Sequence, residues 1–173
     1  MGTVRTAQFA DATGIARVHV DSWRTTYKGI FPDELLANRS YERREQYWQQ
    51  ALNDPAQITV VTEDETGKIV GFVTGGLARE GDPVYRGELY AIYILQEAQR
   101  HGLGRRLIGE LARRLAERQI ASMMLWVLAN NPACSFYEAV GGQVIKQKRD
   151  QIGGAFYDEL AYGWTDLSPL LHL

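Results

Sequence analysis

A glycine-rich loop carries the most informative chemistry in the sequence. The segment QRHGLGRR, residues 99–106, lies between an apolar stretch and an amphipathic one. Glycines at 102 and 104 allow the backbone to turn sharply and to approach a ligand closely. The free amides and positive dipole at a helix start favour an anion, and the basic side chains crowded there would otherwise be disfavoured. The loop therefore predicts a phosphate or pyrophosphate site, with a solvated glycine-rich turn as the alternative.

Two other phosphate-binding motifs do not fit this loop. A dinucleotide-binding fingerprint needs a third glycine, but residue 107 is Leu, and the loop lies in the middle of the chain. A P-loop ends in GK followed by Ser or Thr, and that ending is absent.

The elements on either side of the loop must position it. Residues 87–95, rich in Tyr and Ile, predict a central strand that is buried on both faces. The helix after the loop has an inner stripe of Leu103, Leu107, Leu111 and Leu115. Further strands are predicted at 3–7, 58–62, 69–77, 122–128, 143–149 and 156–164, and helices at 11–27, from 32, at 40–52 and at 131–140. This order predicts an α/β domain with a mixed sheet.

Composition narrows the class of protein. The chain has 173 residues, 45% apolar and 23% charged, as expected for a globular protein that folds as a single domain over 1–173. Its net charge of −2 argues against nucleic acid as a partner. We expect a cytoplasmic protein with no membrane partner, because no signal peptide or apolar span is present. Cys134 cannot form an internal disulfide, and the scattered His19, His101 and His172 predict no metal site.

Two spaced motifs resemble the GNAT superfamily of N-acetyltransferases. Gln99, Gly102 and Gly104 match the family's [RQ]-x-x-G-x-[GA] loop, and residues 130–142, NNPACSFYEAVGG, match its second signature. The segment 22–30, SWRTTYKGI, also resembles a stretch found in bacterial members, so the likeness covers about residues 3–165. It implies a mixed, mostly antiparallel sheet of six to seven strands flanked by helices, with acetyl-CoA as co-substrate and no metal.

The resemblance also implies roles for individual residues. The family's pyrophosphate loop corresponds to residues Gln99, Arg100, His101, Gly102, Leu103, Gly104 and Arg105. Backbone amides of Ile92, Tyr93 and Ile94 would polarise the thioester carbonyl, and Asn130 would bind the cofactor arm. Tyr137 would protonate the leaving thiolate, since a phenol of pKa about 10 is protonated at neutral pH. The alternative for Tyr137 is a half-buried core tyrosine.

The resemblance gives less guidance on the general base and on the residues that bind the acceptor. Glu88 is a candidate base acting through water, or else a strand-end residue paired with Arg79 or Arg86. Relatives that acetylate protein N-termini carry a Glu where this chain has Leu125, which disfavours ribosomal-protein substrates. Trp23, Tyr27 and Phe31 are candidate acceptor-binding residues, although an aromatic stripe at helical spacing also suits core packing.

These residues together predict an enzyme that transfers the acetyl group of acetyl-CoA to a primary amine of a small molecule, by direct attack in a ternary complex. A protein or peptide acetyltransferase and a non-catalytic acyl-CoA sensor are the alternatives. The apolar tail 167–173 could be covered by a second copy, which allows a homodimer.

Overall fold

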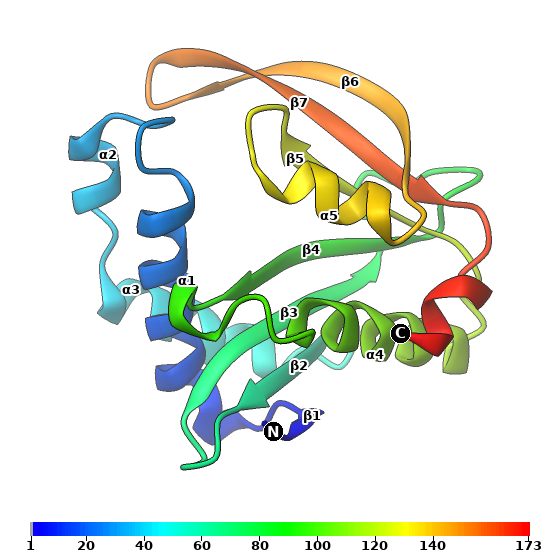
Figure 1. Cartoon of the computed structure of the whole chain (residues 1–173), viewed down its shortest axis with the longest axis horizontal. Coiled ribbons are helices and arrows are strands. Elements are labelled where there is room, and N and C mark those ends of the chain that lie inside the picture. Colours follow the sequence, from blue (N-terminus) through cyan, green and yellow to red (C-terminus); the bar gives the residue numbers. More distant parts are fainter. Residues whose placement is uncertain (1) are drawn as a thin grey trace.

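The computed structural model describes residues 2–173, whose strands form one mixed sheet (Figure 1). The strand order is β1-β2-β3-β4-β5-β7-β6, and of these neighbours only β4 and β5 are parallel. The strands are β1 Val4–Thr6, β2 Ile58–Glu63, β3 Ile69–Leu77, β4 Gly87–Ile94, β5 Met123–Leu128, β6 Gln143–Ile152 and β7 Ala155–Trp164. The α-helices are α1 Ala12–Thr26, α2 Asp33–Ala37, α3 Tyr41–Leu52, α4 Leu103–Glu117 and α5 Ala133–Ala139, with 3-10 turns η1 Phe9–Asp11, η2 Gln96–Ala98 and η3 Ser168–His172. The predicted elements and the mixed, mostly antiparallel sheet are confirmed.

The helices cover the two faces of the sheet separately (Figure 1). Alternate strand residues point to opposite faces, so Val60 and Val73 pack with α4 while Val61 and Phe72 pack with α1 and α3. All four leucines of the predicted α4 stripe are buried. No helix within residues 2–173 has both the length and the apolar character needed to cross a bilayer.

Strand β4 departs from the prediction of burial on both faces. Gly87 to Leu89 are buried, but Tyr90 to Ile94 are only partly buried. The reason is that β5 pairs with β4 only at Gly87 and Glu88, opposite Met123 and Met124. Beyond that point the two strands diverge, and one edge of β4 faces open space.

The C-terminal tail packs against its own chain. Leu167 and Leu170 are buried in the core that contains α4, and the Leu167 amide donates to the Ala121 carbonyl at 3.0 Å. The carbonyl oxygen of Leu170 lies so close to Gly109 of α4 that an added Cβ would be 3.0 Å from it. Leu167 and Leu170 are therefore covered within the chain, whereas Leu171 is 42% exposed, and the homodimer stays a prediction.

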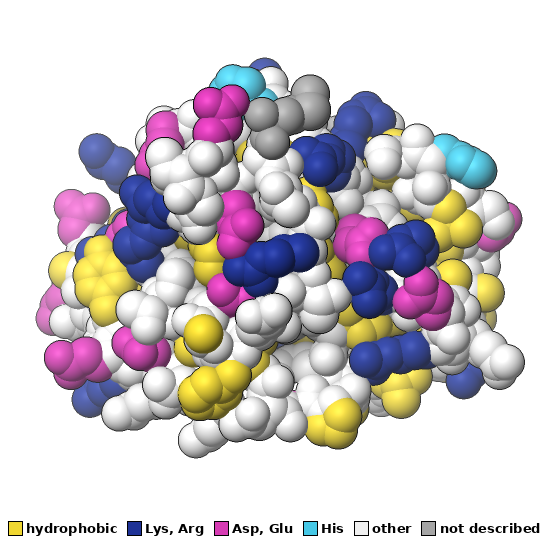
Figure 2. Space-filling model, turned by 90° about the horizontal axis from the view of Figure 1, so that it is seen from below, with side chains coloured by type: hydrophobic (Ala, Val, Ile, Leu, Met, Phe, Trp, Pro, Cys, Tyr) yellow, Lys and Arg dark blue, Asp and Glu magenta, His cyan; other side chains and the backbone are white. Residues whose placement is uncertain are grey.

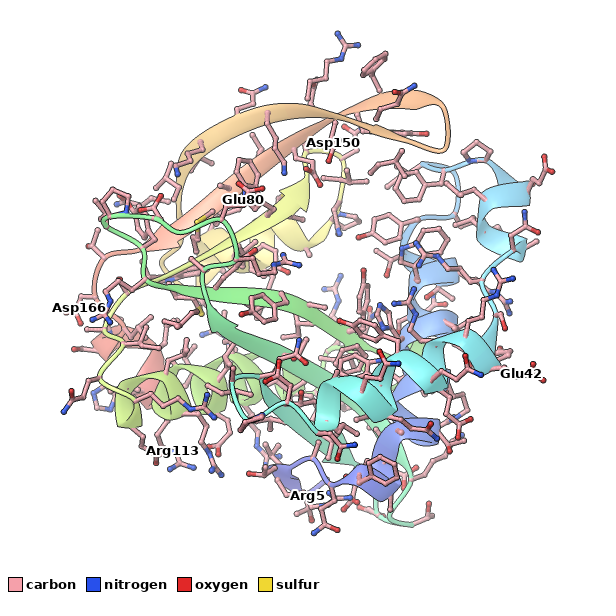
Figure 3. All side chains as sticks on the ribbon, turned by 180° about the vertical axis from the view of Figure 1, so that it is seen from behind. Arg5, Glu42, Glu80, Arg113, Asp150 and Asp166 are labelled. Carbon is pink, nitrogen blue, oxygen red and sulfur yellow. The ribbon has the colours of Figure 1, made fainter. Side chains whose placement is uncertain are left out.

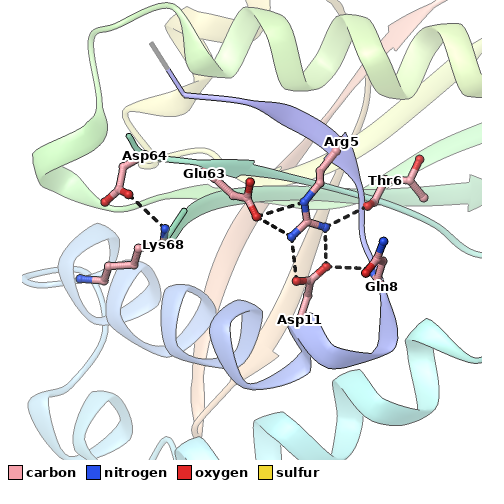
Figure 4. Close-up of polar contacts among 7 residues, drawn as sticks. All are labelled: Arg5, Thr6, Gln8, Asp11, Glu63, Asp64 and Lys68. Carbon is pink, nitrogen blue, oxygen red and sulfur yellow. Dashed lines mark hydrogen bonds and ion pairs between the residues drawn. The ribbon is translucent and has the colours of Figure 1, made fainter. Parts of the chain in front are cut away.

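A cluster of partly buried charged residues connects β1 to β2 and to the turn before α1 (Figure 4). The Arg5 guanidinium donates to both carboxylate oxygens of Asp11, at 2.7 and 2.9 Å, and its Nε donates to Glu63 of β2 at 3.0 Å. Asp11 also accepts from the Gln8 amide at 2.7 Å. Around this edge the surface seen in Figure 2 intersperses basic and acidic side chains, as expected for a chain with small net charge.

The ion cluster predicts an acid-sensitive part of the stability. The hydrogen bonds from Arg5 lower the pKa of Asp11 below its ordinary value. A depressed carboxyl pKa stabilises the fold above the unfolded pKa of about 4 and loses that contribution as pH falls through the folded value. We expect Asp11→Asn to lower the free energy of unfolding by about 1 kcal/mol at pH 7, in urea titrations, and by less at pH 3.

The exposed Asp150 of β6, labelled in Figure 3, provides the control. Its carboxylate accepts from the Gln151 amide and has no basic partner among residues 2–173, so Asp150→Asn should change the stability little at either pH. An Asp11→Asn deficit that is the same at both pH values would contradict the assignment.

Candidate active site

The divergence of β4 from β5 opens a cleft of about 720 Å³. Its walls come from five parts of the chain: Tyr90 to Ile94 of β4, Trp126 and Val127 of β5, the loop and first turn of α4, the face of α5, and the end of α1. A volume of this size is within the range of cofactor and small-molecule sites. The cleft therefore brings the predicted phosphate loop, the β4 backbone and Tyr137 to one place.

The anion-binding end of the cleft is the start of α4. Gly102 has φ of 77° and nothing within 4 Å of where its Cβ would lie, so glycine is required there by backbone conformation alone. No side chain caps the helix, which leaves the amides of its first turn without acceptors. Arg100 and Arg105 line the cleft. His101 does not line it, although the predicted site included it; this side chain is exposed and contacts the Ala98 carbonyl.

The second glycine of the loop is required for a different reason. A Cβ on Gly104 would lie 3.3 Å from the ring of Phe136, a cleft residue of α5. The two walls of the cleft meet at this point, so Gly104 sets how closely α4 approaches α5.

The backbone of β4 presents free groups to the cleft at alternate residues. The Leu95 amide donates to the Val70 carbonyl of β3, and hydrogen bonds alternate along an antiparallel pair. The backbone of Tyr93 therefore also faces β3, whereas the amides of Ile92 and Ile94 face the cleft. The Gln99 side chain donates to the Ile94 carbonyl at 3.0 Å, which agrees with this orientation. Of the three predicted residues, Ile92 and Ile94 offer amides, and Tyr93 instead contributes its side chain.

Tyr137 lies on α5 and is 5% exposed, with its side chain in the core and on the wall of the cleft. Burial raises the pKa of its hydroxyl above the ordinary value, and Tyr27 and Cys134 raise it further. No hydrogen bond to this hydroxyl is formed within residues 2–173. The group is therefore a protonated phenol whose proton is not committed to a partner.

Of the two asparagines before α5, Asn131 lines the cleft and the predicted Asn130 does not. Asn130 is exposed and lines a separate recess of about 120 Å³, next to the hairpin of β6 and β7, so it is not positioned on the cleft. Asn131 is 8% exposed, lines the cleft, and accepts from the Ala133 amide at 2.9 Å. The sequence placed residue 131 only at the start of a predicted helix, and the structure shows that its side chain bonds the first turn of that helix at the cleft wall.

A pair of tyrosines forms a further part of the cleft wall, which we call the tyrosine end. The hydroxyls of Tyr27 and Tyr93 are 3.3 Å apart, and both side chains line the cleft. Trp23 and Phe31, predicted with Tyr27 as acceptor-binding residues, are 6% and 5% exposed and do not line it. They stack behind Tyr27, with ring centroids 5.4 and 4.8 Å from it, so they support the site from the core.

Glu88 is held in an ion pair outside the cleft. It is 4% exposed, and its carboxylate accepts from the Arg79 amide at 2.8 Å and from the Arg79 guanidinium at 2.6 Å. Arg79 also stacks on the ring of Tyr90, 4.6 Å from its centroid. Of the two predicted roles of Glu88, the structure shows the ion pair with Arg79. This pair holds the loop between β3 and β4 against β4.

Cys134 does not behave as a nucleophile in this arrangement. It does not line the cleft, and burial raises the pKa of its thiol, which keeps it protonated. Within residues 2–173 no three His, Cys, Asp or Glu side chains are grouped so that they could hold a metal ion.

Known proteins resemble this chain in sequence and in fold. Residues 69–150, from β3 to most of β6, match the FR47-like protein family. The chain belongs to the GNAT superfamily of N-acetyltransferases, since a curated N-acetyltransferase resembles it over almost the full length. That relative is the uncharacterized N-acetyltransferase YuaI of Bacillus subtilis, 40% identical over 170 residues, which are 98% of this chain and 96% of YuaI.

Solved structures share the fold at lower identity. The PaiA N-acetyltransferase from Thermoplasma acidophilum, in complex with coenzyme A, has a TM-score of 0.70 and 21% identity, covering 92% of this chain and 98% of that one. The yncA protein of Salmonella typhimurium, with its cofactor acetyl-CoA, has a TM-score of 0.71 and 20% identity, covering 96% and 94%. This chain thus has the fold of proteins whose structures contain CoA or acetyl-CoA.

The Glu88–Arg79 pair predicts a stability effect. We expect Glu88→Gln to lower the free energy of unfolding at pH 7 by about 1–3 kcal/mol, because a buried carboxylate that accepts charged hydrogen bonds is replaced by an amide. Urea denaturation measures the change. The matched control is Glu80→Gln in the same loop (Figure 3), since Glu80 is exposed and makes no contact that holds the strand. Equal stability losses in the two variants would contradict the structural role of Glu88.

Proposed function

We propose that this N-acetyltransferase uses acetyl-CoA and acetylates the primary amine of a small molecule by direct attack in a ternary complex. The observation that carries the proposal is the position of Tyr137, a buried, protonated phenol on the wall of a cleft whose other wall is a free strand edge. The two ends of the cleft also differ in kind. One end has arginines and a helix start, and the other has tyrosines.

The residues of the cleft fit acetyl-CoA. Arg100, Arg105 and the first-turn amides of α4 would bind the pyrophosphate, which is negatively charged. The free edge of β4, including the amides of Ile92 and Ile94, would pair with the peptide-like pantetheine arm as a neighbouring strand would. When bound, acetyl-CoA supplies a thioester, whose carbonyl carbon is the acceptor of the amine nitrogen.

Residues of this chain would act at three stages of the transfer. Amides of β4 donate to the carbonyl oxygen, where negative charge develops as the new C–N bond forms. Tyr137 donates its proton to the sulfur as the C–S bond breaks, and the amine proton that leaves with bond formation returns to solvent or to the phenolate. The products are the acetamide and the free thiol, so atoms and charge balance.

Tyr137 suits this role because its environment holds the proton until it is needed. A raised pKa in a site without hydrogen-bonding partners means that the phenol remains neutral throughout the physiological range. Glu88 is left outside the reacting groups, since the carboxylate is bound to Arg79 and does not reach the cleft. In this mechanism the amine enters as its neutral form, and no side chain of the cleft is needed as a base.

The position of Gly104 predicts that stability and cofactor binding change in opposite directions. Alanine at residue 104 should keep or slightly raise the melting temperature, because it favours the helix by about 0.5–1 kcal/mol relative to glycine. It should weaken acetyl-CoA binding, and Gly104→Val should weaken it by on the order of tenfold or more, because the side chain meets Phe136. Calorimetric titration gives the affinity. Ala116→Val, at an exposed position of the same helix, should bind normally; equal affinity in Gly104→Val would contradict the assigned cleft.

Removing the Tyr137 hydroxyl tests the proposed acid. We expect Tyr137→Phe to lower kcat at least tenfold, measured as release of CoA thiol across a panel of amines, while calorimetry shows an unchanged affinity for acetyl-CoA. Tyr47→Phe, at an exposed position on α3, serves as the control. Full activity in Tyr137→Phe would remove the acid role, and absence of acetyl-CoA binding by the wild-type protein would overturn the proposed function itself.

A further inference from the structure

The cleft is lined by side chains from both faces of the sheet. On the α4 face, Val127 of β5 lines it and belongs to the core around α4. On the opposite face, Tyr93 of β4 lines it and packs with residues of α1. Trp126 also lines the cleft and lies on this second face, because side chains alternate along β5 and Leu128 packs with Trp23 of α1. The gap between the strands therefore connects two sides of the cleft, which we call the α4 side and the α1 side.

The charged side chains of the cleft belong to its anion-binding end. Within residues 2–173, Arg100 and Arg105 are the charged residues that line the cleft, and no Asp, Glu, Lys or His side chain does so. Burying an ion without a counter-charge is costly. A molecule that occupies the α1 side therefore gains nothing from a carboxylate or a second ammonium placed there, and we expect its bound part to be uncharged.

Tyr90 is a second aromatic residue that lines the α1 side. It lies at a β-bulge, where the register between β3 and β4 shifts. A Cβ on Gly75 would meet Leu111 of α4, so the next residue, Gly76, faces the α1 side. A Cβ on Gly76 would lie 2.8 Å from the Tyr90 hydroxyl, which places the tyrosine on the same side. That hydroxyl donates to the Leu77 carbonyl at 2.6 Å, so the ring is held in place.

The rings of Tyr90 and Trp126 flank the gap where it begins. Each residue lies two positions beyond the last residue of its strand that takes part in the pairing of β4 with β5. A cation covers one face of each ring, with Arg79 at 4.6 Å from the centroid of Tyr90 and Lys148 at 4.3 Å from that of Trp126. Both cations are paired with carboxylates. The cations thus support the rings without adding a free charge, and they disfavour an ammonium group on the other side of either ring.

The tyrosine end supplies polar groups for an amine. The hydroxyls of Tyr27 and Tyr93 are 3.3 Å apart, and whichever of them donates, one O–H proton and a lone pair on each oxygen remain. An oxygen lone pair can accept an N–H of a neutral amine and leave the nitrogen lone pair free to attack. Tyr93 lies between Ile92 and Ile94, whose amides face the cleft, so an amine held at this hydroxyl pair is beside the strand edge assigned to the thioester.

We propose that the acceptor is a primary amine whose remaining part is an uncharged aromatic ring, and that this ring binds on the α1 side between Tyr90 and Trp126. The inference rests on the proposed function, since the amine of the same molecule must reach the thioester. Aromatic rings gain from offset or edge-to-face contacts with one another, and a saturated ring of similar size lacks this gain. Trp126 is therefore a specificity-determining residue.

The test measures CoA thiol release with phenethylamine and with cyclohexylethylamine, which has a saturated ring of similar size. We expect Trp126→Leu to lower the ratio of the two kcat/KM values at least about threefold, mainly through KM. Comparing this ratio between enzymes cancels the difference in basicity of the amines. Phenylalanine and a linear diamine, which add a charge, should have kcat/KM values at least about tenfold below that of phenethylamine. Phe9→Leu, at an exposed position of η1, is the matched control and should keep the wild-type ratio.

The outcomes separate this inference from the proposed function. A ratio that is unchanged in Trp126→Leu, or equal turnover of the charged amines, overturns the aromatic site and leaves the acetyltransferase reaction in place. If Trp126→Leu does not fold, Tyr90→Leu on the opposite wall gives the same comparison. If no small amine turns over, the small-molecule reaction fails, and calorimetry of phenethylamine with the protein in the presence of CoA decides the site. Binding that is weakened in Trp126→Leu at an unchanged melting temperature supports the site, and absence of binding to the wild type overturns it.

Discussion

The separation of two parallel strands after only two paired residues determines most of what this molecule can do. Strand β5 leaves β4 beyond Glu88 and Met124, yet it remains paired with β7 from Met123 to Leu128. β4 in turn stays paired with β3 on its other side. Both strands are thus held from outside, so the gap between them is a fixed part of the sheet and not a frayed end. The backbone groups exposed along it need a partner that the chain itself does not provide.

Charge is distributed according to this gap. Arginines that serve the fold are matched with carboxylates or carbonyls, as at Arg5 and Arg79. Arg100 and Arg105, which have no such partner among residues 2–173, line the cleft at the start of α4. With a net charge of only −2, the chain as a whole gives no sign of this arrangement. The information lies in which charges remain unpaired, and that appears only after the chain has folded.

The sequence predicted the fold better than the site, and for a physical reason. Periodicity reports which face of an element is buried, so the leucine stripe of α4 and the strands of the hairpin could be placed correctly. Periodicity does not show which residues far apart in the sequence contact each other. Strand register and helix packing determine those contacts, and they pair Glu88 with Arg79 and place Trp23 and Phe31 in the core. The half-burial of β4 was missed for the same reason, since it depends on where β5 goes. Residue 131 was placed at the start of a predicted helix, and the position of Asn131 on the cleft required the structure.

The residues that face the two ends of the cleft come from different parts of the chain. The anion-binding end is built from β4, α4 and α5, all inside the segment 69–150 that matches the FR47-like family. The tyrosine end combines Tyr93 of β4, which lies inside that match, with α1 and the segment up to α3, which precede it, and with the hairpin, whose Tyr157 packs against Phe31 at 5.0 Å. The N-terminal segment and the hairpin contact each other through side chains such as those of Phe31 and Tyr157. Divergence among relatives can therefore replace the acceptor-facing half while the half shared by the family stays unaltered, so that one inherited scaffold accommodates new acceptors.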